Sequence, residues 1–316
     1  MKQSYSNTKI WLGVMFLALI WGSTWLAIKI GLNDAPPFQC AGLRFFLATL
    51  FLLIWLKITK KNLPFNYKFW FRAISLSTIM FTIPYGMVYL GEQYISTGLG
   101  SVLFSTQSLF VVIFAHFILH DEKAKLYKWF GLIVGISGLV FIYHDDMSLN
   151  GRLYYLGMFY VLIAAASGGL SLVYLRNIRN NFDPFIEVTS QLIVTTIVFL
   201  IIGFGFENKT TNYYSTSLWV SIVYLALIGT SLAFVIYYWL SKHASAITVS
   251  FSIFTAPVFA VFFGWFFFGE LIGIYGKIGF FLVVVSIIIT NVLPEYTISR
   301  NKRKLVRENN GKKYII

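Results

Sequence analysis

The stretch IWLGVMFLALIWGSTWLAIKI, residues 10–30, is a predominantly apolar run about as long as a lipid bilayer is thick, with Lys29 as its one charged residue. A transmembrane α-helix needs about 20 such residues at a rise of ~1.5 Å each. Lys9 precedes the run, and no small-residue cleavage site follows it. We therefore interpret the run as a first membrane span and not as a signal peptide.

The composition argues against a water-soluble protein. Hydrophobic residues account for 58% of the 316 residues, charged residues account for only 12%, and the mean hydropathy is +0.73. A soluble domain typically has about 25% charged residues, so this chain lacks the polar surface to dissolve and is expected to be an integral membrane protein. The single cysteine, Cys40, excludes an internal disulfide and a multi-cysteine metal site. We expect no metal, cofactor or catalytic residue.

Breaks in the apolar pattern divide the chain into ten predicted spans. Turn and charge signals at Asn33–Pro37, Lys60–Pro64, Asp121–Lys125 and Asn180–Pro184 mark the clearest breaks. The spans are expected at 10–30, 37–56, 70–90, 97–119, 126–143, 152–174, 185–206, 216–240, 244–268 and 273–293. The predicted fold class is an all-α membrane protein with ten transmembrane helices.

The sequence also matches itself. A shift of 148 positions aligns Tyr89, Glu122 and Gly131 with Tyr237, Glu270 and Gly279, and a shift of 147 aligns Pro37-Phe38 with Pro184-Phe185. Related halves that are rich in membrane-length segments are typical of carriers built from internal repeats around a central site. We assign residues 10–143 to a first five-helix repeat, 152–293 to a second one and 294–316 to a basic cytoplasmic tail.

Lysine and arginine are distributed unequally between the two sides of the predicted spans. With a cytoplasmic N-terminus, nearly all of the 25 basic residues fall in cytoplasmic segments, and only Lys29, Arg152, Lys209 and Lys277 fall in outer ones. The positive-inside rule therefore predicts that both termini are cytoplasmic. Because each repeat has an odd number of spans, the second repeat must be inverted relative to the first. The basic residues lie in short loops and in the tail, which argues against a nucleic-acid partner.

Several motifs together resemble the EamA-type branch of the drug/metabolite transporter superfamily. The first span contains Trp21-Gly22-Ser23-Thr24-Trp25, the second contains Arg44-Phe45, and the apolar run from Phe262 ends in Gly269-Glu270. The resemblance extends over about residues 10–293, in two EamA-like units. It implies a secondary transporter of the cell (inner) membrane that works by alternating access. The resemblance also implies that the protein's partners are the lipid bilayer and a small-molecule substrate, most often an amino acid or related compound that is exported.

Arg44 lies about eight residues into the second span, where an unpaired arginine costs roughly 2.5–3.5 kcal/mol or more. It would attract a substrate carboxylate or phosphate through bidentate hydrogen bonds. The alternative is that Arg44 hydrogen-bonds backbone carbonyls and stabilises helix packing.

Other polar and aromatic residues complete the predicted substrate-binding site. Trp21 and Ser23 in the first span, Tyr85 in the third, Gln107 in the fourth and Thr255 in the ninth are expected to line a central cavity. The alternative for Trp21 is an interfacial aromatic belt, and the alternative for Gln107 is an interhelical hydrogen bond.

Prolines interrupt two of the spans. Pro84 in the third span and Pro257 in the ninth are each expected to act as a kink or a hinge. The position in the fourth span that aligns with Pro257 is Leu109, so we expect the first half to lack a helix break there. Tyr89 and Tyr237 lie near predicted span ends, where interfacial anchoring is the simpler account.

Small residues form stripes in spans five and ten, at Gly131, Gly135 and Gly138 and at Gly273, Gly276 and Gly279. Such stripes allow close helix packing, and a homodimer seam is one alternative use of them.

The positions of acidic residues and histidines argue against two competing functions. No Asp or Glu lies deep in a predicted span, which argues against a proton antiporter with a membrane-embedded glutamate. The four histidines are scattered over loops and span ends, which disfavours a membrane enzyme. Nucleotide-linked or phosphorylated metabolites are the alternative substrate class, although one intramembrane arginine supplies little positive charge to bind a phosphate. A non-transporting membrane protein is a further alternative.

Overall fold

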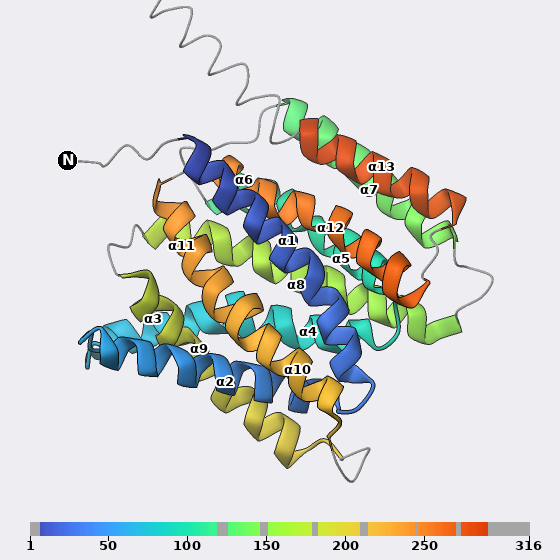
Figure 1. Ribbon diagram of the computed structural model, residues 1–316. Coiled ribbons are helices and arrows are strands. Elements are labelled where there is room, and N and C mark those ends of the chain that lie inside the picture. Colours follow the sequence, from blue (N-terminus) through green and yellow to red (C-terminus); the bar gives the residue numbers. More distant parts are fainter. Residues whose placement is uncertain are drawn as a thin grey trace, which may run out of the picture.

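The structure is built of helices within the residues that it describes. The computed structural model describes residues 7–118, 126–145, 151–178, 183–208, 214–243, 246–269 and 273–289, and no strand occurs in these ranges. The helices are α1 (Asn7–Leu32), α2 (Pro37–Ile58), α3 (Tyr67–Ser77), η1 (Thr78–Thr82), α4 (Ile83–Glu92), α5 (Thr97–Ser105), α6 (Gln107–Ile118), α7 (Leu126–Asp145), α8 (Gly151–Ile178), α9 (Pro184–Gly205), α10 (Thr216–Tyr224), η2 (Leu225–Leu232), α11 (Ala233–His243), α12 (Ala246–Phe268) and α13 (Ile274–Ile287) (Figure 1). The π-helical elements η1 and η2 join α3 to α4 and α10 to α11 without a gap.

Not every predicted span is confirmed. Within the described residues, seven helical stretches are long and apolar enough to cross a membrane. They are Thr8–Leu32, Pro37–Ile58, Tyr67–Glu92, Thr97–Ile118, Gly151–Leu175, Pro184–Gly205 and Thr216–Ser241. The other apolar helices, at Trp129–Gly138, Thr255–Phe268 and Ile274–Ser286, are shorter. The all-helical class is therefore confirmed for the described residues, whereas ten crossings are not. Glu122, Glu270 and the predicted tail at 294–316 lie outside those residues.

Proline and a capping carboxylate define where two central helices begin. Pro37 and Pro184 each stand in the first turn of a helix, where the missing N–H would have no intrahelical partner. Asp183 caps α9 by accepting a hydrogen bond of 2.9 Å from the Phe185 N–H. The Pro-Phe pairs that align in the sequence thus start equivalent helices, α2 and α9.

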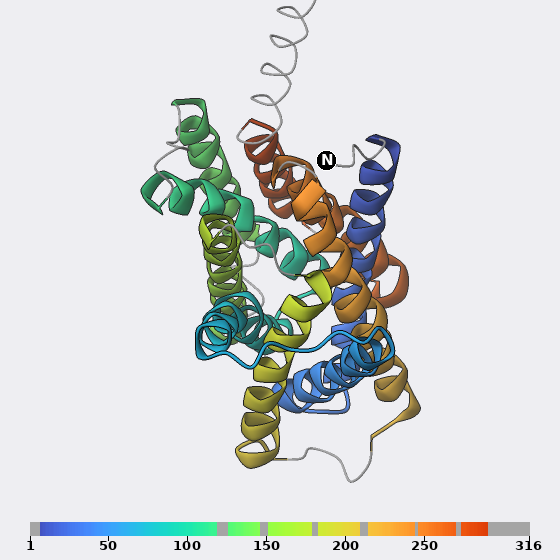
Figure 2. The ribbon, with the colours of Figure 1, turned by 90° about the vertical axis from the view of Figure 1, so that its left-hand side faces the viewer.

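Equivalent helices of the two halves make equivalent packing contacts. α1 packs on α12 as α8 packs on α5 and α6, while α2 packs on α9 and α7 packs on α13. Both views place the α2–α9 pair and the α7–α13 pair at opposite margins of the bundle (Figure 1, Figure 2). Exchanging equivalent helices leaves this set of contacts unchanged, as an internal repeat requires.

The α7–α13 contact depends on small residues. A Cβ on Gly138 would lie 2.7 Å from the Gly279 carbonyl oxygen, and a Cβ on Gly135 would lie 2.7 Å from Ser286 Oγ. Both distances are shorter than any ordinary contact, so the two helices approach this closely only because these residues are glycine. Glycines of both predicted stripes therefore pack within one chain, and no homodimer seam is needed to explain them.

The helix break lies where the prolines do not predict it. Between α5 and α6, the Thr106 hydroxyl and N–H both donate to the Leu103 carbonyl, at 2.6 and 3.1 Å. Such a side-chain bond competes with the regular helix pattern and tightens the turn. α12, in contrast, runs through Pro257 as one helix. The expectation that the first half lacks a break near Leu109 is therefore wrong, because the threonine interrupts the helix three residues earlier.

The two π-helical segments occupy equivalent places in the repeat. A shift of 148 moves Thr78–Thr82 to positions 226–230, inside η2 (Leu225–Leu232). π-helical turns are rare and frequently lie at functional sites. Pro84 follows η1 inside a continuous helix, where it has no N–H to donate to the helical hydrogen-bond pattern. The irregular winding of this span is thus a π turn that precedes Pro84.

Candidate functional site

A pocket lies between helices of both halves. Its lining comes from α1, η1, α4, α5 and α6 of the first half and from α8, α11 and α12 of the second. The lining residues are Trp21, Thr24, Trp25, Ile28, Met80, Pro84, Tyr85, Val88, Ser101, Phe104, Gln107, Gly168, Ser171, Phe234, Tyr237, Ile253 and Ala256. About 90 Å³ is open to the centre of a water molecule, several times the ~10–15 Å³ that one water needs. The space suits a small solute.

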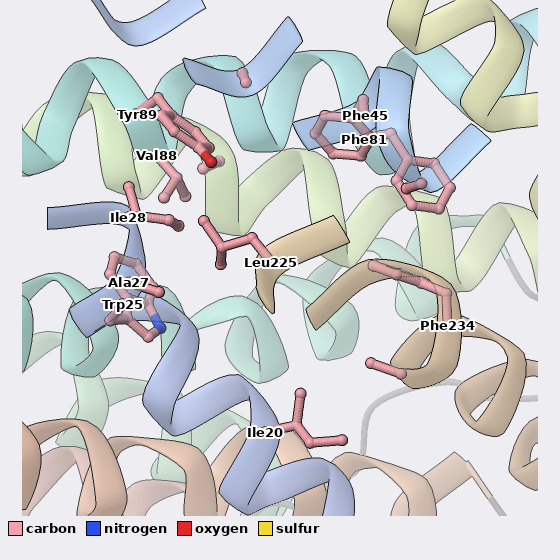
Figure 3. Close-up of a cluster of buried hydrophobic side chains, with 14 of the residues drawn as sticks. Ile20, Trp25, Ala27, Ile28, Phe45, Phe81, Val88, Tyr89, Leu225 and Phe234 are labelled. Carbon is pink, nitrogen blue, oxygen red and sulfur yellow. The ribbon is translucent and has the colours of Figure 1, made fainter. Parts of the chain in front are cut away.

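Aromatic rings from both halves meet at this pocket. The Trp21 ring lies 5.9 Å from the Phe234 ring and 5.5 Å from the Tyr237 ring, centroid to centroid. Tyr85 lies 6.2 Å from Phe234 in an edge-to-face arrangement. In Figure 3, Phe234 lies on the same side of the buried cluster as Phe45 and Phe81, across from Trp25, Ile28 and Val88. The rings supply apolar area and faces that bind planar or apolar groups.

The polar groups of the pocket carry no charge. No charged side chain is among the lining residues in the described part of the chain. Thr24 Oγ1 donates to the Trp21 carbonyl at 2.8 Å, and Ser171 Oγ donates to the Gly168 carbonyl at 2.7 Å, so both hydroxyl donors are engaged within their own helices. Gln107 approaches Gly168 so closely that a Cβ there would lie 2.6 Å from Gln107 Oε1. The Gln107 amide is therefore the polar side chain with the most hydrogen-bonding capacity at the pocket wall.

The structure brings together some of the residues that the sequence singles out. Trp21, Pro84, Tyr85 and Gln107 all line the pocket. Ser23 does not, because it points to another helix and lies 2.5 Å from the Tyr224 hydroxyl.

Thr255 and Pro257 also fall outside the lining, although their neighbour Ala256 contributes to it. Successive residues of a helix point about 100° apart, and of these three only Ala256 faces the pocket.

Arg44 lies beside the pocket and not in its wall. Its side chain is 1% exposed, and its Nε donates to Thr230 Oγ1 at 2.8 Å. Nη2 donates to the Gly229 carbonyl at 3.4 Å, and the guanidinium carbon lies 4.7 Å from the centre of the Tyr85 ring. These contacts correspond to the packing alternative for Arg44, because they tie it to a helix backbone and separate it from the pocket by Tyr85.

Sequence reasoning missed several pocket residues. Tyr237, which lines the pocket, is 4% exposed, and Tyr89, which does not, is 1% exposed, so interfacial anchoring is wrong for both. Phe234 follows η2 directly and was not distinguishable from the other phenylalanines in the apolar runs. Gly168 and Ser171 lie three residues apart on α8, a small-residue pattern that a search for close helix contacts would find.

Hydrogen bonds tie α2 to α9 at both ends. At one end, Lys61 and Asp183 form an ion pair of 2.6 Å. At the other end, Glu207 accepts hydrogen bonds of 3.1 and 3.0 Å from the N–H groups of Phe38 and Gln39, at the N-terminus of α2. Burial raises the pKa of Glu207 above its ordinary value, although the two N–H groups act to lower it.

A buried polar chain leads from the pocket to the start of α9. Glu187 forms an ion pair of 2.7 Å with Arg72 and accepts a bond of 3.3 Å from Gln191 Nε2. The Tyr238 hydroxyl donates to Gln191 Oε1 at 3.1 Å and lies 3.4 Å from the sulfur of Met80, a lining residue. This chain connects α3 of the first half with α9 and α11 of the second.

Comparisons with known proteins agree on one family. The model of the EamA-like transporter family matches the chain twice, at residues 8–144 and 155–292. A protein of Bacillus subtilis, "Uncharacterized transporter YoaV", is 31% identical over 294 residues, which is 93% of this chain and 99% of that protein. "Uncharacterized inner membrane transporter YedA" of Escherichia coli is 29% identical over 257 residues, covering 80% of this chain and 81% of that one. "Protein PagO" of Salmonella typhimurium is 24% identical over 280 residues, covering 88% and 91%.

A solved structure supports the fold as well. One crystal structure superposes with a TM-score of 0.66 and covers 92% of this chain and 99% of that chain, at 16% sequence identity. At this identity the likeness concerns the fold alone. The matches to both halves by the family model, together with the long alignment to a relative above 30% identity, show that the chain belongs to the EamA-like transporter family.

Proposed function

We propose that the protein carries a small, largely apolar metabolite across the cell membrane through the pocket between its halves. The observation that carries the proposal is the lining itself, which both halves provide and which is aromatic and uncharged. A site at the interface of two repeats is alternately exposed when one repeat rocks against the other. The EamA-like family supports a membrane transporter of small molecules.

The proposed substrates are amino acids or related compounds, and the proposed direction is export. Trp21 and Tyr85 contact the apolar part of the solute in this proposal, and Gln107 hydrogen-bonds its polar part, since an amide both donates and accepts. In this proposal both termini lie in the cytoplasm, as the positive-inside rule predicts, and the units at 10–143 and 152–293 are the bodies that move.

A carrier of nucleotide-linked or phosphorylated metabolites fits this pocket less well. A phosphate carries up to two negative charges and is usually bound by arginine or lysine. Arg44, which contacts the ring of the lining residue Tyr85, already donates to Thr230 and Gly229. The pocket volume of about 90 Å³ also favours a smaller solute.

Flux through purified protein in liposomes tests the proposal. We expect vesicles with the protein to exchange radiolabelled L-leucine faster than empty vesicles, and glucose 6-phosphate no faster. Phe104→Ala removes a lining ring and should lower leucine flux severalfold, because a buried aromatic side chain supplies much of the apolar contact.

Phe266→Ala is the matched control. Phe266 lies on α12 with 64% of its surface exposed and does not line the pocket, so this variant should keep the wild-type flux. Equal loss in both variants would argue against the pocket as the route. A higher flux of glucose 6-phosphate than of leucine would support the phosphorylated class instead. In cells, deletion should raise the intracellular pool of the solute if the direction is export.

A further inference from the structure

We infer that Arg44 is a positioning residue of the pocket. Arg44 fixes the position of Tyr85, in the first half, relative to the π-helical turn η2, in the second half, and does not itself bind the solute. The inference rests on the proposed function only in taking this pocket as the solute site. It assigns to the buried arginine a role that its chemistry alone does not suggest, since an intramembrane arginine is by default a ligand for anions.

The first support is what the guanidinium binds. Its hydrogen bonds go to Thr230 Oγ1 and to the Gly229 carbonyl, both in η2. Thr230 Oγ1 donates in turn to the Leu225 carbonyl at 2.8 Å, the residue five positions earlier, which is the spacing of a π-helical turn. No carboxylate of the described residues forms an ion pair with Arg44. The Nε and Nη2 groups of the arginine are therefore engaged by neutral groups of the turn.

The second support is the position of that turn. η2 leads directly into α11, which carries the lining residues Phe234 and Tyr237. Gly229 lies next to both Arg44 and the pocket wall, because a Cβ on it would lie 2.8 Å from Cγ2 of the lining residue Thr24 and 3.7 Å from Arg44 Nη2. η2 is thus in close contact with α1 at Gly229 and continuous with the start of α11.

The third support is the contact with Tyr85. The guanidinium carbon lies 4.7 Å from the Tyr85 ring centre and 5.3 Å from that of Phe45, whose ring meets Tyr85 edge-to-face at 5.1 Å. A cation over an aromatic face is attracted by the ring quadrupole, and more strongly when both are desolvated. Tyr85 in turn meets Phe234 at 6.2 Å across the pocket wall. Arg44 therefore contacts Tyr85 directly. It is connected to Phe234 indirectly, because it is hydrogen-bonded to η2 and η2 leads into α11.

The equivalent π turn of the first half is held by the equivalent helix of the second, but without a charge. A shift of 147 places Arg44 on Gln191 of α9. The Gln191 carbonyl accepts a bond of 2.8 Å from Ser77 Oγ, and Thr195 Oγ1 lies 2.7 Å from the same hydroxyl, at the residue before η1. Each π turn, or the residue directly before it, is therefore hydrogen-bonded to the second span of the opposite half, by the Arg44 side chain at η2 and by the Gln191 carbonyl and the Thr195 hydroxyl at Ser77.

Variants of both partners test the inference. Arg44→Gln removes the guanidinium, and Thr230→Val removes its hydroxyl partner at nearly unchanged volume. Thr49→Val is the control, since Thr49 is a buried threonine of the same helix, α2, whose hydroxyl lies 2.9 Å from the Thr196 hydroxyl of α9 and makes its hydrogen bond there and not with η2. Flux of L-leucine and of L-leucinamide, which lacks the carboxylate, is measured in liposomes, and amide hydrogen exchange is measured over residues 225–237.

A positioning role predicts the same loss for both solutes. Arg44→Gln should lower leucine and leucinamide flux by a similar factor, on the order of tenfold, as expected when a charged hydrogen-bond donor is removed. Thr230→Val should lower both in the same ratio, the double variant should be no worse than Arg44→Gln alone, and Thr49→Val should retain most of the flux. Exchange over residues 225–237 should rise in Arg44→Gln and Thr230→Val and stay at the wild-type level in Thr49→Val.

Two results would overturn the inference. One is a selective loss of leucine flux in Arg44→Gln with leucinamide unaffected, which would make Arg44 a ligand of the carboxylate. The other is unchanged exchange over residues 225–237 in that variant. If wild-type protein moves neither solute, the proposed amino-acid substrates are wrong, and the hydrogen-exchange comparison still decides whether Arg44 holds η2.

Discussion

The ion pair between Arg72 and Glu187 should be a major source of stability between the two halves. Its Nη2–Oε1 distance is 2.7 Å, and the side chains are 19% and 3% exposed. Breaking a buried pair by removing one partner typically costs about 3–5 kcal/mol, because the remaining charge is left in a poorly solvated site. The cost should be unequal for the two partners, since the arginine reaches water more easily than the carboxylate.

We therefore expect Arg72→Gln to cost about 3 kcal/mol or more, because it leaves Glu187 buried with its charge only partly compensated by Gln191. Glu187→Gln should cost less, about 1–2 kcal/mol, since the freed guanidinium of Arg72 is partly hydrated and also lies 5.5 Å from the Phe69 ring centre. The coupling energy of a double-mutant cycle should reach about 1.5–3 kcal/mol, the range of hydrogen bonds between charged groups.

The measurement is the free energy of unfolding by SDS titration from mixed micelles, for the wild type, both single variants and the double variant. Lys61→Gln serves as the comparison, because its ion pair with Asp183 has side chains that are 36% and 33% exposed. Exposed pairs contribute about 0–1 kcal/mol, so this variant should be nearly neutral. A coupling energy near zero for Arg72 and Glu187, or a larger cost for Glu187→Gln than for Arg72→Gln, would refute the burial argument.

Three further outcomes follow from close contacts and from a capping carboxylate. Gly22→Val should cost about 1–3 kcal/mol in the same unfolding assay, because even a Cβ there would lie 2.4 Å from a Cβ on α12. Gly168→Ala should displace the Gln107 amide and lower solute flux severalfold with a small change in stability, since the clashing atom ends a flexible side chain. Burial acts to raise the pKa of Asp183, but hydrogen bonds from Lys61 and backbone N–H groups leave that pKa below its ordinary value of about 3.8. The stabilisation by Asp183 should therefore be complete above about pH 5 and disappear as the pH falls through the lowered pKa, so the melting temperatures of wild type and Asp183→Asn should converge in acid.

The sequence identifies pocket-lining residues best where an amide or a ring with a polar tip stands in an apolar run. Trp21, Tyr85 and Gln107 stand out because rings with polar tips and amides are costly to place in lipid, and all three line the pocket. Ser23 and Thr255 stand out for the same reason but lie outside the lining. A small hydroxyl can be satisfied by its own helix or by a neighbour, as Ser23 is by the Ile20 carbonyl at 2.8 Å, so its presence does not indicate a cavity.

The sequence by itself determined that the chain is a helical membrane protein of two related halves, because bilayer-length apolar runs and their repetition are local properties of the chain. It also located the starts of α2 and α9, since proline acts on the backbone wherever it stands. Only the tertiary structure decided that Arg44 binds η2, that Tyr237 is buried at a pocket and that the fourth span breaks at Thr106. Lipid and protein interior are equally apolar, so hydrophobicity does not reveal which face of a helix meets lipid and which meets another helix. That choice depends on packing between helices that are distant in the sequence, such as α1 and α12.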